Sequence, residues 1–476
     1  MQNESADGGT ADATIAPTRP TPKKRVFDLA WPVIGESFLE TMLMVVDTWM
    51  VAQLSTAAIA GVGASVQVMF FIIAALSALG VGSSVLVAQA FGARKLAEAA
   101  RLARQSIVWS ILISVPLAVT GYFLAGPIIG LFGTEADVAR IGEEYLQVTM
   151  ATVVVLVVLM IGGGALRGLG DSQTPMRVTA LANVVNIFLT YGLIFGVAGL
   201  PALGAVGSAW GTFLSRLLAA TLLLVVMWRG RQGVAIAGRN NWLPEVKVAS
   251  SILRIGVPAA LEQLLTAAAF TLMTVIVAGL GTAALASHRI AFNVLSLSFL
   301  PGFGFGIAAT ALVGQSVGAR EPGEGSEAAA IATRWSATWM GVMGVVSFIL
   351  AEPIIRLFSQ DPAVIREGVA AVQVVALAQP FWAVLFVQSG AMRGLGNTGF
   401  PLRANAGGLW STMLIAWVAV TFFNGGIAQV WGVFLITSPI MAVVLWRRFK
   451  REVTEWTAEV EGDPLPVAQP EAVSVP

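Results

Sequence analysis

The sequence predicts an all-α integral membrane protein with twelve transmembrane helices in two six-helix bundles related by a pseudo-twofold axis. Hydrophobic residues make up 56% of the chain and charged residues only 12%, whereas charged residues approach about a quarter of a soluble protein. The chain also repeats after 226 positions without a gap: PIIGLF at 127–132 returns as PIIRLF at 353–358, and GALRGLGDSQTP at 164–175 returns as GAMRGLGNTGFP at 390–401. Because this period is far longer than a solenoid repeat, it indicates two copies of a whole bundle.

The apolar stretches of the first half place six helices in order. A span of the hydrocarbon core needs roughly 20 helical residues, and six stretches are long enough. We expect helices at 28–53, 58–92, 96–131, 137–166, 175–198 and 203–229, with six more following 226 residues later. Several of these stretches are longer than a bilayer requires, so some helices should tilt or protrude.

Basic residues mark alternate ends of these helices. Lys23 to Arg25 precede the first helix, Arg94 follows the second, Arg167 follows the fourth, and RRFKR at 447–451 follows the last. The opposite connections, such as QLST, GLGT and FFNGG, carry no Lys or Arg. Because basic residues favour the cytoplasmic ends of membrane helices, both termini are predicted to be cytoplasmic. An even number of helices per half makes the halves parallel repeats, with the substrate expected between them.

Five segments follow from this pattern. We expect a polar cytoplasmic arm at 1–26, an N-terminal bundle at 27–230, a cytoplasmic linker at 231–248, a C-terminal bundle at 249–450 and a cytoplasmic tail at 451–476. The arm has no apolar core region, so it is not a cleavable signal.

Several kinds of chemistry are excluded. The chain has no cysteine and a single histidine, His288, which rules out disulfides, thiolate metal sites and multi-histidine clusters. It has no GxxxxGK[ST] phosphate loop and no arrangement that resembles a catalytic triad. We therefore expect neither an enzyme nor a cofactor, and uphill transport would have to be driven by an ion gradient.

Three acidic residues lie on one face of the first predicted helix. At about 100° per residue, Glu40 lies about 40° from Glu36, and Asp47 about 20° back from Glu40. Ionisable groups inside a membrane segment are costly and usually face protein or water. Only Glu262 keeps a carboxylate at the matching position of the second half, so we expect the halves to share a scaffold but not their electrostatics. A carboxyl group in a low-dielectric site can hold a proton or a cation.

A second polar stripe lies on the predicted helix at 175–198, where Asn183, Asn186 and Thr190 share one face, and Gln67 lies on the helix at 58–92. If the helices at 28–53 and 175–198 adjoin, Asp47 gains neutral oxygen partners suited to a small hard cation. The alternative for each of these polar residues is an interhelical hydrogen bond that holds the bundle together.

Together these residues resemble the multidrug and toxic compound extrusion (MATE) family, in particular its DinF-like bacterial branch. The resemblance covers residues 25–450 and rests on VDTWMVAQL in the first helix, VAQAFGAR and VGQSVGAR, the paired RGLGD and RGLGN turns, NVVNIFLTYGLIFG, and PAALEQ. It implies a V-shaped pair of bundles that alternates between inward-open and outward-open states and exports organic cations or other amphipathic compounds in exchange for Na⁺ or H⁺.

By motif, Asp47 falls on the family's coupling aspartate and Asn186 on its asparagine, while Glu262 lies near a family glutamate. Together with the two polar stripes, this predicts ion coupling, with a bound Na⁺ or H⁺, at Asp47, Asn186, Asn183 and Thr190. The substrate or proton cavity is expected at Glu36, Glu40, Glu262 and Gln67. Thr190 and Gln379 stand where some members carry carboxylates, and Arg289 interrupts the family pattern HQI, for which the sequence offers no explanation.

The resulting hypothesis is a monomeric secondary antiporter of the bacterial inner membrane, with a small-molecule substrate and the lipid bilayer as its partners and no nucleic acid. Ion binding at Asp47 would repack its helix, with Pro32 and Pro258 as hinges. Two other classes remain open: a flippase for lipid-linked saccharides, which would call for a basic cavity, and a channel or receptor, which would need no paired halves.

Overall fold

A computed structural model describes residues 20–238 and 240–462, and these fold into fifteen α-helices in two groups. We call the first group the N-lobe; its helices are α1 (Pro22–Ala52), α2 (Thr56–Gly92), α3 (Leu96–Gly130), α4 (Ala136–Ala151), α5 (Val153–Gly168), α6 (Gln173–Phe195) and α7 (Ala205–Arg229). The second group, the C-lobe, contains α8 (Val246–Ala278), α9 (Thr282–Ala319), α10 (Pro322–Ile349), α11 (Ala351–Phe358), α12 (Pro362–Gly394), α13 (Gly399–Phe423), α14 (Ile427–Gly432) and α15 (Phe434–Gly462).

The predicted fold class is confirmed. Within the described residues, 10 helices are long and apolar enough to cross a membrane, and the number rises to 12 if each bent pair counts as one span. The bent pairs are α4 with α5, at 50°, and α10 with α11, at 71°. These breaks lie at Thr152 and Leu350, which are not equivalent positions of the repeat, so the two lobes share a topology but differ in the shape of individual spans.

The repeated RGLG motif forms the same turn in both lobes. Gly170 and Gly396 take left-handed backbone conformations, with φ of 86° and 89°, which glycine adopts without steric cost. The next residue then caps the following helix: Asp171 Oδ1 accepts from the Thr174 backbone N–H at 2.9 Å, and Asn397 Oδ1 accepts from the Phe400 backbone N–H at 3.1 Å.

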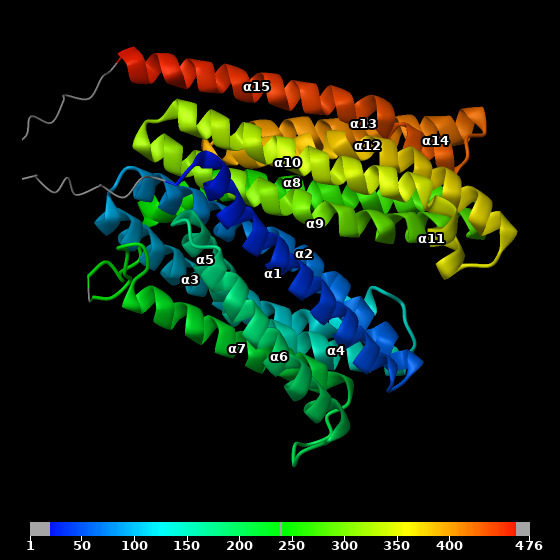
Figure 1. The fold of residues 1–476 in the computed structure, drawn as a ribbon. Helices are drawn as coiled ribbons and strands as arrows, with labels where there is room; N and C mark the ends of the chain where they lie inside the picture. Colours follow the sequence, from blue (N-terminus) through cyan, green and yellow to red (C-terminus); the bar gives the residue numbers. More distant parts are fainter. Residues whose placement is uncertain (1–19, 239, 463–476) are drawn as a thin grey trace, which may run out of the picture.

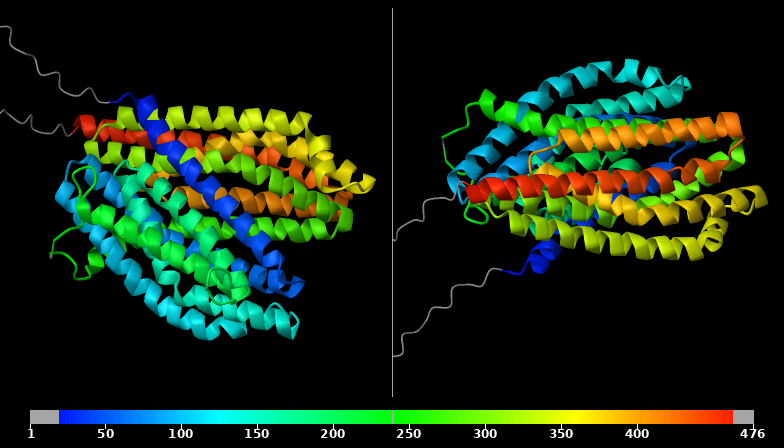
Figure 2. Two further views of the ribbon diagram at one scale, coloured as in Figure 1. Left: turned by 60° about the horizontal axis from the view of Figure 1, so that its bottom comes forward. Right: turned by 90° about the horizontal axis from the view of Figure 1, so that it is seen from above.

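The two lobes meet at one end of the molecule and diverge toward the other. Figures 1 and 2 show the helices converging where the chain enters α1 and leaves α15, an end that we call the terminus side. Toward the opposite end, the far side, α1 and α6 separate from α9 and α11 in Figure 1. The arrangement is a V of two helical bundles.

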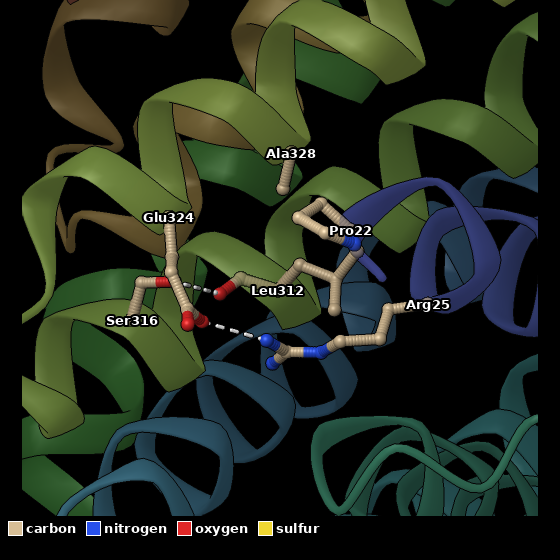
Figure 3. A pocket seen from close by; sticks show the side chains of 6 residues that line it. All are labelled: Pro22, Arg25, Leu312, Ser316, Glu324 and Ala328. Atoms are coloured by element: carbon tan, nitrogen blue, oxygen red, sulfur yellow. Dashed lines mark hydrogen bonds and ion pairs between the residues drawn. The ribbon is translucent and has the colours of Figure 1, made fainter. Parts of the chain in front are cut away.

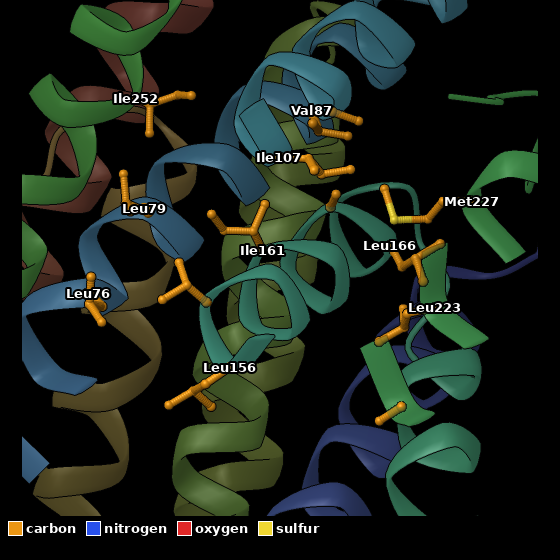
Figure 4. Close-up of a cluster of buried hydrophobic side chains, with 14 of the residues drawn as sticks. Leu76, Leu79, Val87, Ile107, Leu156, Ile161, Leu166, Leu223, Met227 and Ile252 are labelled. Carbon is orange, nitrogen blue, oxygen red and sulfur yellow. The ribbon is translucent and has the colours of Figure 1, made fainter. Parts of the chain in front are cut away.

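Each lobe buries the first turns of the other lobe's leading helix. Val26, Leu29 and Ala30 of α1 belong to a hydrophobic cluster built from α9, α10 and α12 of the C-lobe. In the same way, Val248 and Ile252 of α8 belong to the N-lobe core, where Figure 4 shows Ile252 beside the cluster that contains Leu79. The lobes are therefore interlocked on the terminus side.

The segments outside the bundles are partly anchored. In the linker, the backbone carbonyls of Asn241 and Leu243 accept hydrogen bonds from Gln105 of α3. The predicted tail at 451–476 differs from the structure, because α15 continues through Gly462 and its Trp456 lies against Gly325 of α10. Likewise, residues 22–26 of the predicted arm already belong to α1, while 1–19 and 463–476 lie outside the described residues.

Candidate functional site

Glu36 of α1 is held in an ion pair within the N-lobe. Arg167, near the end of α5, donates from Nη1 to Glu36 Oε2 at 2.9 Å, and Thr179 of α6 donates to Oε1 at 3.3 Å. The side chains of Glu36 and Arg167 are only 15% and 19% exposed. Both carboxylate oxygens are thus engaged, so Glu36 joins three helices of the lobe and has little capacity left for a ligand.

Glu262 of α8 repeats this arrangement in the C-lobe. Arg393 donates from Nη2 to Glu262 Oε2 at 2.9 Å, and Asn405 donates from Nδ2 to Oε1 at 2.6 Å. Each of these residues lies 226 positions after its counterpart Glu36, Arg167 or Thr179. The carboxylate that the two halves have in common thus also has equivalent partners, whereas Glu40 and Asp47 have no acidic counterpart farther along the helix.

Asp47 occupies a different environment, closer to the far side. It is half-buried inside the N-lobe beside Thr212 of α7, and its Oδ1 atom is buried without a hydrogen-bond partner among the described residues. Arg216 of α7 and Tyr145 of α4 are close enough to interact with it electrostatically, and Arg216 forms no ion pair in the described part of the chain. Asp47 is thus a buried acid with one oxygen available.

Asn186 reaches Asp47 indirectly. Its Nδ2 donates to Thr212 Oγ1 at 3.3 Å and to Ser215 Oγ at 3.1 Å, and its Oδ1 accepts from Thr190 at 3.2 Å. Asn186 and Thr190 are fully buried, and Thr212 lies between Asn186 and Asp47. The predicted stripe therefore forms a polar network between α6 and α7 that ends at the carboxylate.

Asn183 makes the contact between helices that the sequence analysis required. Its Nδ2 donates to the backbone carbonyl of Leu39 in α1 at 2.8 Å, so α1 and α6 do adjoin. For Asn183 itself, this is the interhelical hydrogen bond of the alternative interpretation.

Glu40 and Gln67 are the most accessible of the predicted site residues. Glu40 is exposed and interacts electrostatically with Glu36, Arg167 and Arg216. Gln67 is exposed on α2. Around the helix axis it lies about 20° from Ala78, and Ala78 contacts Gly256 of the other lobe. It therefore faces the C-lobe at a level where the lobes have separated. Its counterpart in the repeat, Asn293 of α9, is exposed as well.

The polar residues of the C-lobe core lie among aromatic rings. His288 shares a 3.2 Å hydrogen bond with Thr274 and packs against Trp431 at 5.4 Å between ring centroids. Gln379 is fully buried and accepts from Ser298 at 2.5 Å. Arg289 is exposed and turned away from this cluster.

The arrangement can hold a proton or a cation at one carboxylate. Among the described residues, no group of three His, Cys, Asp or Glu side chains is placed to hold a metal ion. A Na⁺ ion at Asp47 would thus be coordinated by one carboxylate and by a neutral oxygen such as that of Thr212, while Asn186 would act through its hydrogen bond to Thr212. In the C-lobe, Thr266 and the buried Met273 stand at the positions equivalent to Glu40 and Asp47, so the second half has no carboxylate at either of these two positions.

Sequence reasoning missed several partners of these acids. Arg167 and Arg393 were interpreted only as markers of topology, although their place in the repeat matches that of Glu36 and Glu262. Thr212, Arg216 and Tyr145 lie on helices whose neighbours the sequence alone does not specify.

Comparison with known proteins gives a consistent result. The sequence model of the MatE family matches residues 32–192 and 258–418, two segments that are themselves 226 positions apart. The chain is 34% identical over 419 residues to a probable multidrug resistance protein NorM of Thermotoga maritima, which covers 87% of this chain and 89% of that protein. It is 24% identical over 429 residues to the uncharacterized transporter YisQ of Bacillus subtilis, covering 90% and 94%.

Solved structures share the fold. A MOP superfamily transporter from Pyrococcus furiosus superposes with a TM-score of 0.84 at 22% identity, covering 92% of this chain and 97% of that one. A MATE family transporter of the MOP superfamily in an outward-facing conformation superposes with a TM-score of 0.85 at 23% identity, with the same coverage of 92% and 97%.

Proposed function

The chain belongs to the MATE family of membrane transporters, and we propose that it is a secondary antiporter that exports organic cations or other amphipathic compounds in exchange for Na⁺ or H⁺. The name of the Thermotoga maritima relative supports multidrug efflux as the class of transport. The many apolar helices and the bacterial relatives support a place in the bacterial inner membrane.

The observation that carries this proposal is the contrast between Asp47 and Glu36. Both oxygens of Glu36 accept hydrogen bonds, from Arg167 and from Thr179, so neither oxygen is available to an incoming ion. Asp47 keeps a buried oxygen that has no hydrogen-bond partner within residues 20–238 and 240–462. A buried carboxylate that lacks one hydrogen bond gains stability from a proton or a cation, and this property is what ion coupling requires.

Binding at Asp47 would act on the packing of α1. The carboxylate touches the α6 and α7 network through Thr212, whereas the adjacent part of α1 is tied to α6 by Asn183. Neutralising Asp47 weakens its attraction to Arg216 and allows α1 to repack above Pro32. Coupling follows if the ion and the cargo bind the two arrangements with different affinities.

The lobes are joined on the terminus side and separate on the far side. With the basic ends of the helices in the cytoplasm, as the positive-inside rule favours, this arrangement is the outward-open state. Gln67 and Asn293 are exposed polar residues at equivalent positions of α2 and α9, and we expect cargo to meet them.

A flippase for lipid-linked saccharides is less well supported. Pyrophosphate headgroups require unpaired basic residues, but Arg167 and Arg393 are neutralised by Glu36 and Glu262, and Arg216 lies within reach of the charges of Asp47 and Glu40. Beyond the first turn of α1, the exposed charge on this helix is the acid Glu40.

The decisive experiment compares Asp47→Asn with Asp137→Asn in proteoliposomes. Asp137 is an exposed acid in the first turn of α4 and serves as the matched control. We expect Asp47→Asn to abolish ethidium transport driven by an ion gradient, whereas Asp137→Asn transports like the unmodified protein. Transport by Asp47→Asn at the unmodified rate would refute the coupling role.

The same vesicles separate the two ions. Ethidium should dissipate a preset ΔpH if H⁺ is the coupling ion, or a preset Na⁺ gradient if Na⁺ is. Dissipation of neither gradient during ethidium movement would identify a channel-like process and contradict the proposal.

A further inference from the structure

The seam between the lobes is formed by close backbone contacts that repeat across the twofold axis. On the terminus side, Gly92 of α2 lies directly against the backbone carbonyl of Gln315 in α9, and Gly318 of α9 lies against that of Gln89 in α2. A methyl group at either glycine would overlap the opposing carbonyl. The two helices can approach this closely only because both positions are glycine.

Two side-chain amides cross this seam in opposite directions. Gln89 of the N-lobe donates from Nε2 to the backbone carbonyl of Gly394 in the C-lobe at 3.1 Å. Gln315 of the C-lobe donates from Nε2 to the carbonyl of Gly168 in the N-lobe at 2.9 Å. The donors are 226 positions apart and so are the acceptors, so the two bonds are copies of one another.

Each accepting carbonyl adjoins an ion pair of its own lobe. Gly168 follows Arg167, which holds Glu36 of α1, and Gly394 follows Arg393, which holds Glu262 of α8. A movement of either leading helix that displaces its glutamate therefore pulls on the residue next to the seam. The position of α1 is therefore linked, through Glu36 and Arg167, to the seam contact that closes the terminus side.

Arg25 orients one of the two amides. Its Nη2 donates to Gln315 Oε1 at 3.2 Å, which turns the Nε2 of that amide toward Gly168, and its Nη1 pairs with Glu324 at 2.7 Å. Figure 3 shows Arg25 reaching from α1 toward Glu324. The equivalent of Arg25 in the second half is Ser251, so only the Gln315 bond has this support.

We propose that Gln89 and Gln315 are positioning residues of the transport cycle, whose reciprocal hydrogen bonds hold the terminus side closed and must both break before it opens. The inference rests on the proposed function, since it assumes that the lobes alternate between two arrangements. Its partners are groups of this chain alone, and it requires neither cargo nor ion.

The absence of cysteine allows a direct test, because a single introduced thiol is the only reactive one. Val85→Cys reports on the seam: Val85 is fully buried and shares a face of α2 with Ala78 and Gln89. Gly63→Cys reports on the far side, where Gly63 is exposed and has open space beside it. Labelling of the purified full-length protein with a maleimide is measured without cargo or gradient.

We expect Gln89→Leu and Gln315→Leu each to raise the labelling rate of the Val85→Cys reporter roughly two- to tenfold, the population ratio that corresponds to one hydrogen bond. The double variant should raise it further. The labelling rate of Gly63→Cys should fall in the same variants, because opening one side closes the other. Arg25→Ala should reproduce the effect of Gln315→Leu in weaker form.

Gln388→Leu is the matched control. This amide is also buried, but it donates to Thr333 within the C-lobe, so neither reporter should change. Unchanged labelling of Val85→Cys in the double variant would overturn the proposal, and so would faster labelling of both reporters, which indicates general loosening.

Gly92→Ala provides an independent variant if the glutamine variants do not fold. It keeps both amides but forces the backbones apart, so it should also raise Val85→Cys labelling and lower Gly63→Cys labelling. Because no transport is measured, loss of coupling at Asp47 would leave this result unaffected, and the two proposals fail separately.

Discussion

At the scale of residues, the acids of α1 and α8 divide into two kinds. Glu36 and Glu262 are ion-paired and join helices within their lobes, while Asp47 has an oxygen available. The difference arises from the partners that neighbouring helices offer: an arginine next to the RGLG turn in the first case, and hydroxyl groups with a more distant arginine in the second. Position along the membrane helix thus separates the ion-paired acids from the acid for which we propose ion coupling.

Glu36→Gln should destabilise the protein by leaving the charge of Arg167 unpaired. We expect a loss of about 1–3 kcal/mol, less than for a fully buried pair because both side chains remain partly exposed. Glu262→Gln should cost more, since Glu262 is only 7% exposed. Thermal unfolding in detergent measures both variants.

The control for this prediction is Glu352→Gln. Glu352 pairs with Arg356 on the surface of α11, with side chains 56% and 54% exposed, and such pairs contribute little. Equal melting temperatures for Glu36→Gln and Glu352→Gln would contradict the structural role of the Glu36 pair.

Some residues of the candidate site could be predicted from the sequence, and their partners could not. Asp47, Asn186 and Asn183 could be selected from the sequence, because a polar residue in an apolar helix has few explanations. Their partners could not, because Thr212 and Arg216 become neighbours of Asp47 only through the packing of α7. Arg167 and Arg393 were recognisable in principle, since they repeat at the same spacing as the glutamates.

At the scale of elements, glycine determines how closely helices pack. Gly164 of α5 lies against the Gly80 carbonyl of α2, and the equivalent Gly390 of α12 lies against the Gly306 carbonyl of α9. Small residues let membrane helices approach through their backbones, which replaces the hydrophobic driving force that lipid does not provide. The same device therefore builds each lobe and the seam between the lobes.

Gly390→Ala should loosen the crossing of α9 and α12. The added methyl group would overlap the Gly306 carbonyl, so we expect a loss of about 1–3 kcal/mol in a thermal unfolding experiment. Gly407→Ala in α13 is the comparison, because a methyl group there meets open space and alanine favours a helix. If Gly407→Ala destabilised the protein as much as Gly390→Ala, the close contact would not be the cause.

Most helix boundaries could be predicted from the sequence to within a few residues, since apolar length and basic ends both mark them. The bend at Thr152 could not, because it interrupts the run TMATVVVLVV with neither proline nor glycine. Nor did composition indicate that α15 continues to Gly462, which depends on the packing of Phe449 and Trp456 beside α9 and α10.

At the scale of the whole molecule, neither half contains its complete core. The N-lobe cluster includes Ile252 from the second half, and the cluster of α9, α10 and α12 includes Val26 and Leu29 from the first. The interlock leaves each half with exposed apolar surface when it stands alone. A shared joint on the terminus side also explains why the lobes can separate at the far side without dissociating.

Two chains made by cutting the linker after Gly238 should therefore depend on each other. We expect each half expressed alone to aggregate or be degraded, and the two halves expressed together to co-purify through a tag on one of them. Cutting instead at the exposed Gly133 connection, within the N-lobe, is the comparison for the effect of a chain break itself. A stable, monodisperse single half would show that the interlock is dispensable.

The burial of the first turns of α1 and α8 in the opposite lobe has a consequence for a chain of half this length. A half-length chain built to this plan would be an obligate C₂ homodimer in which each subunit lends its first helix to the other, and the reciprocal amides would be one isologous contact counted twice. In a single chain that holds both copies, each copy can carry different side chains within the same geometry. The aspartate at position 47, which stands opposite a methionine at the equivalent position 273, is one such difference.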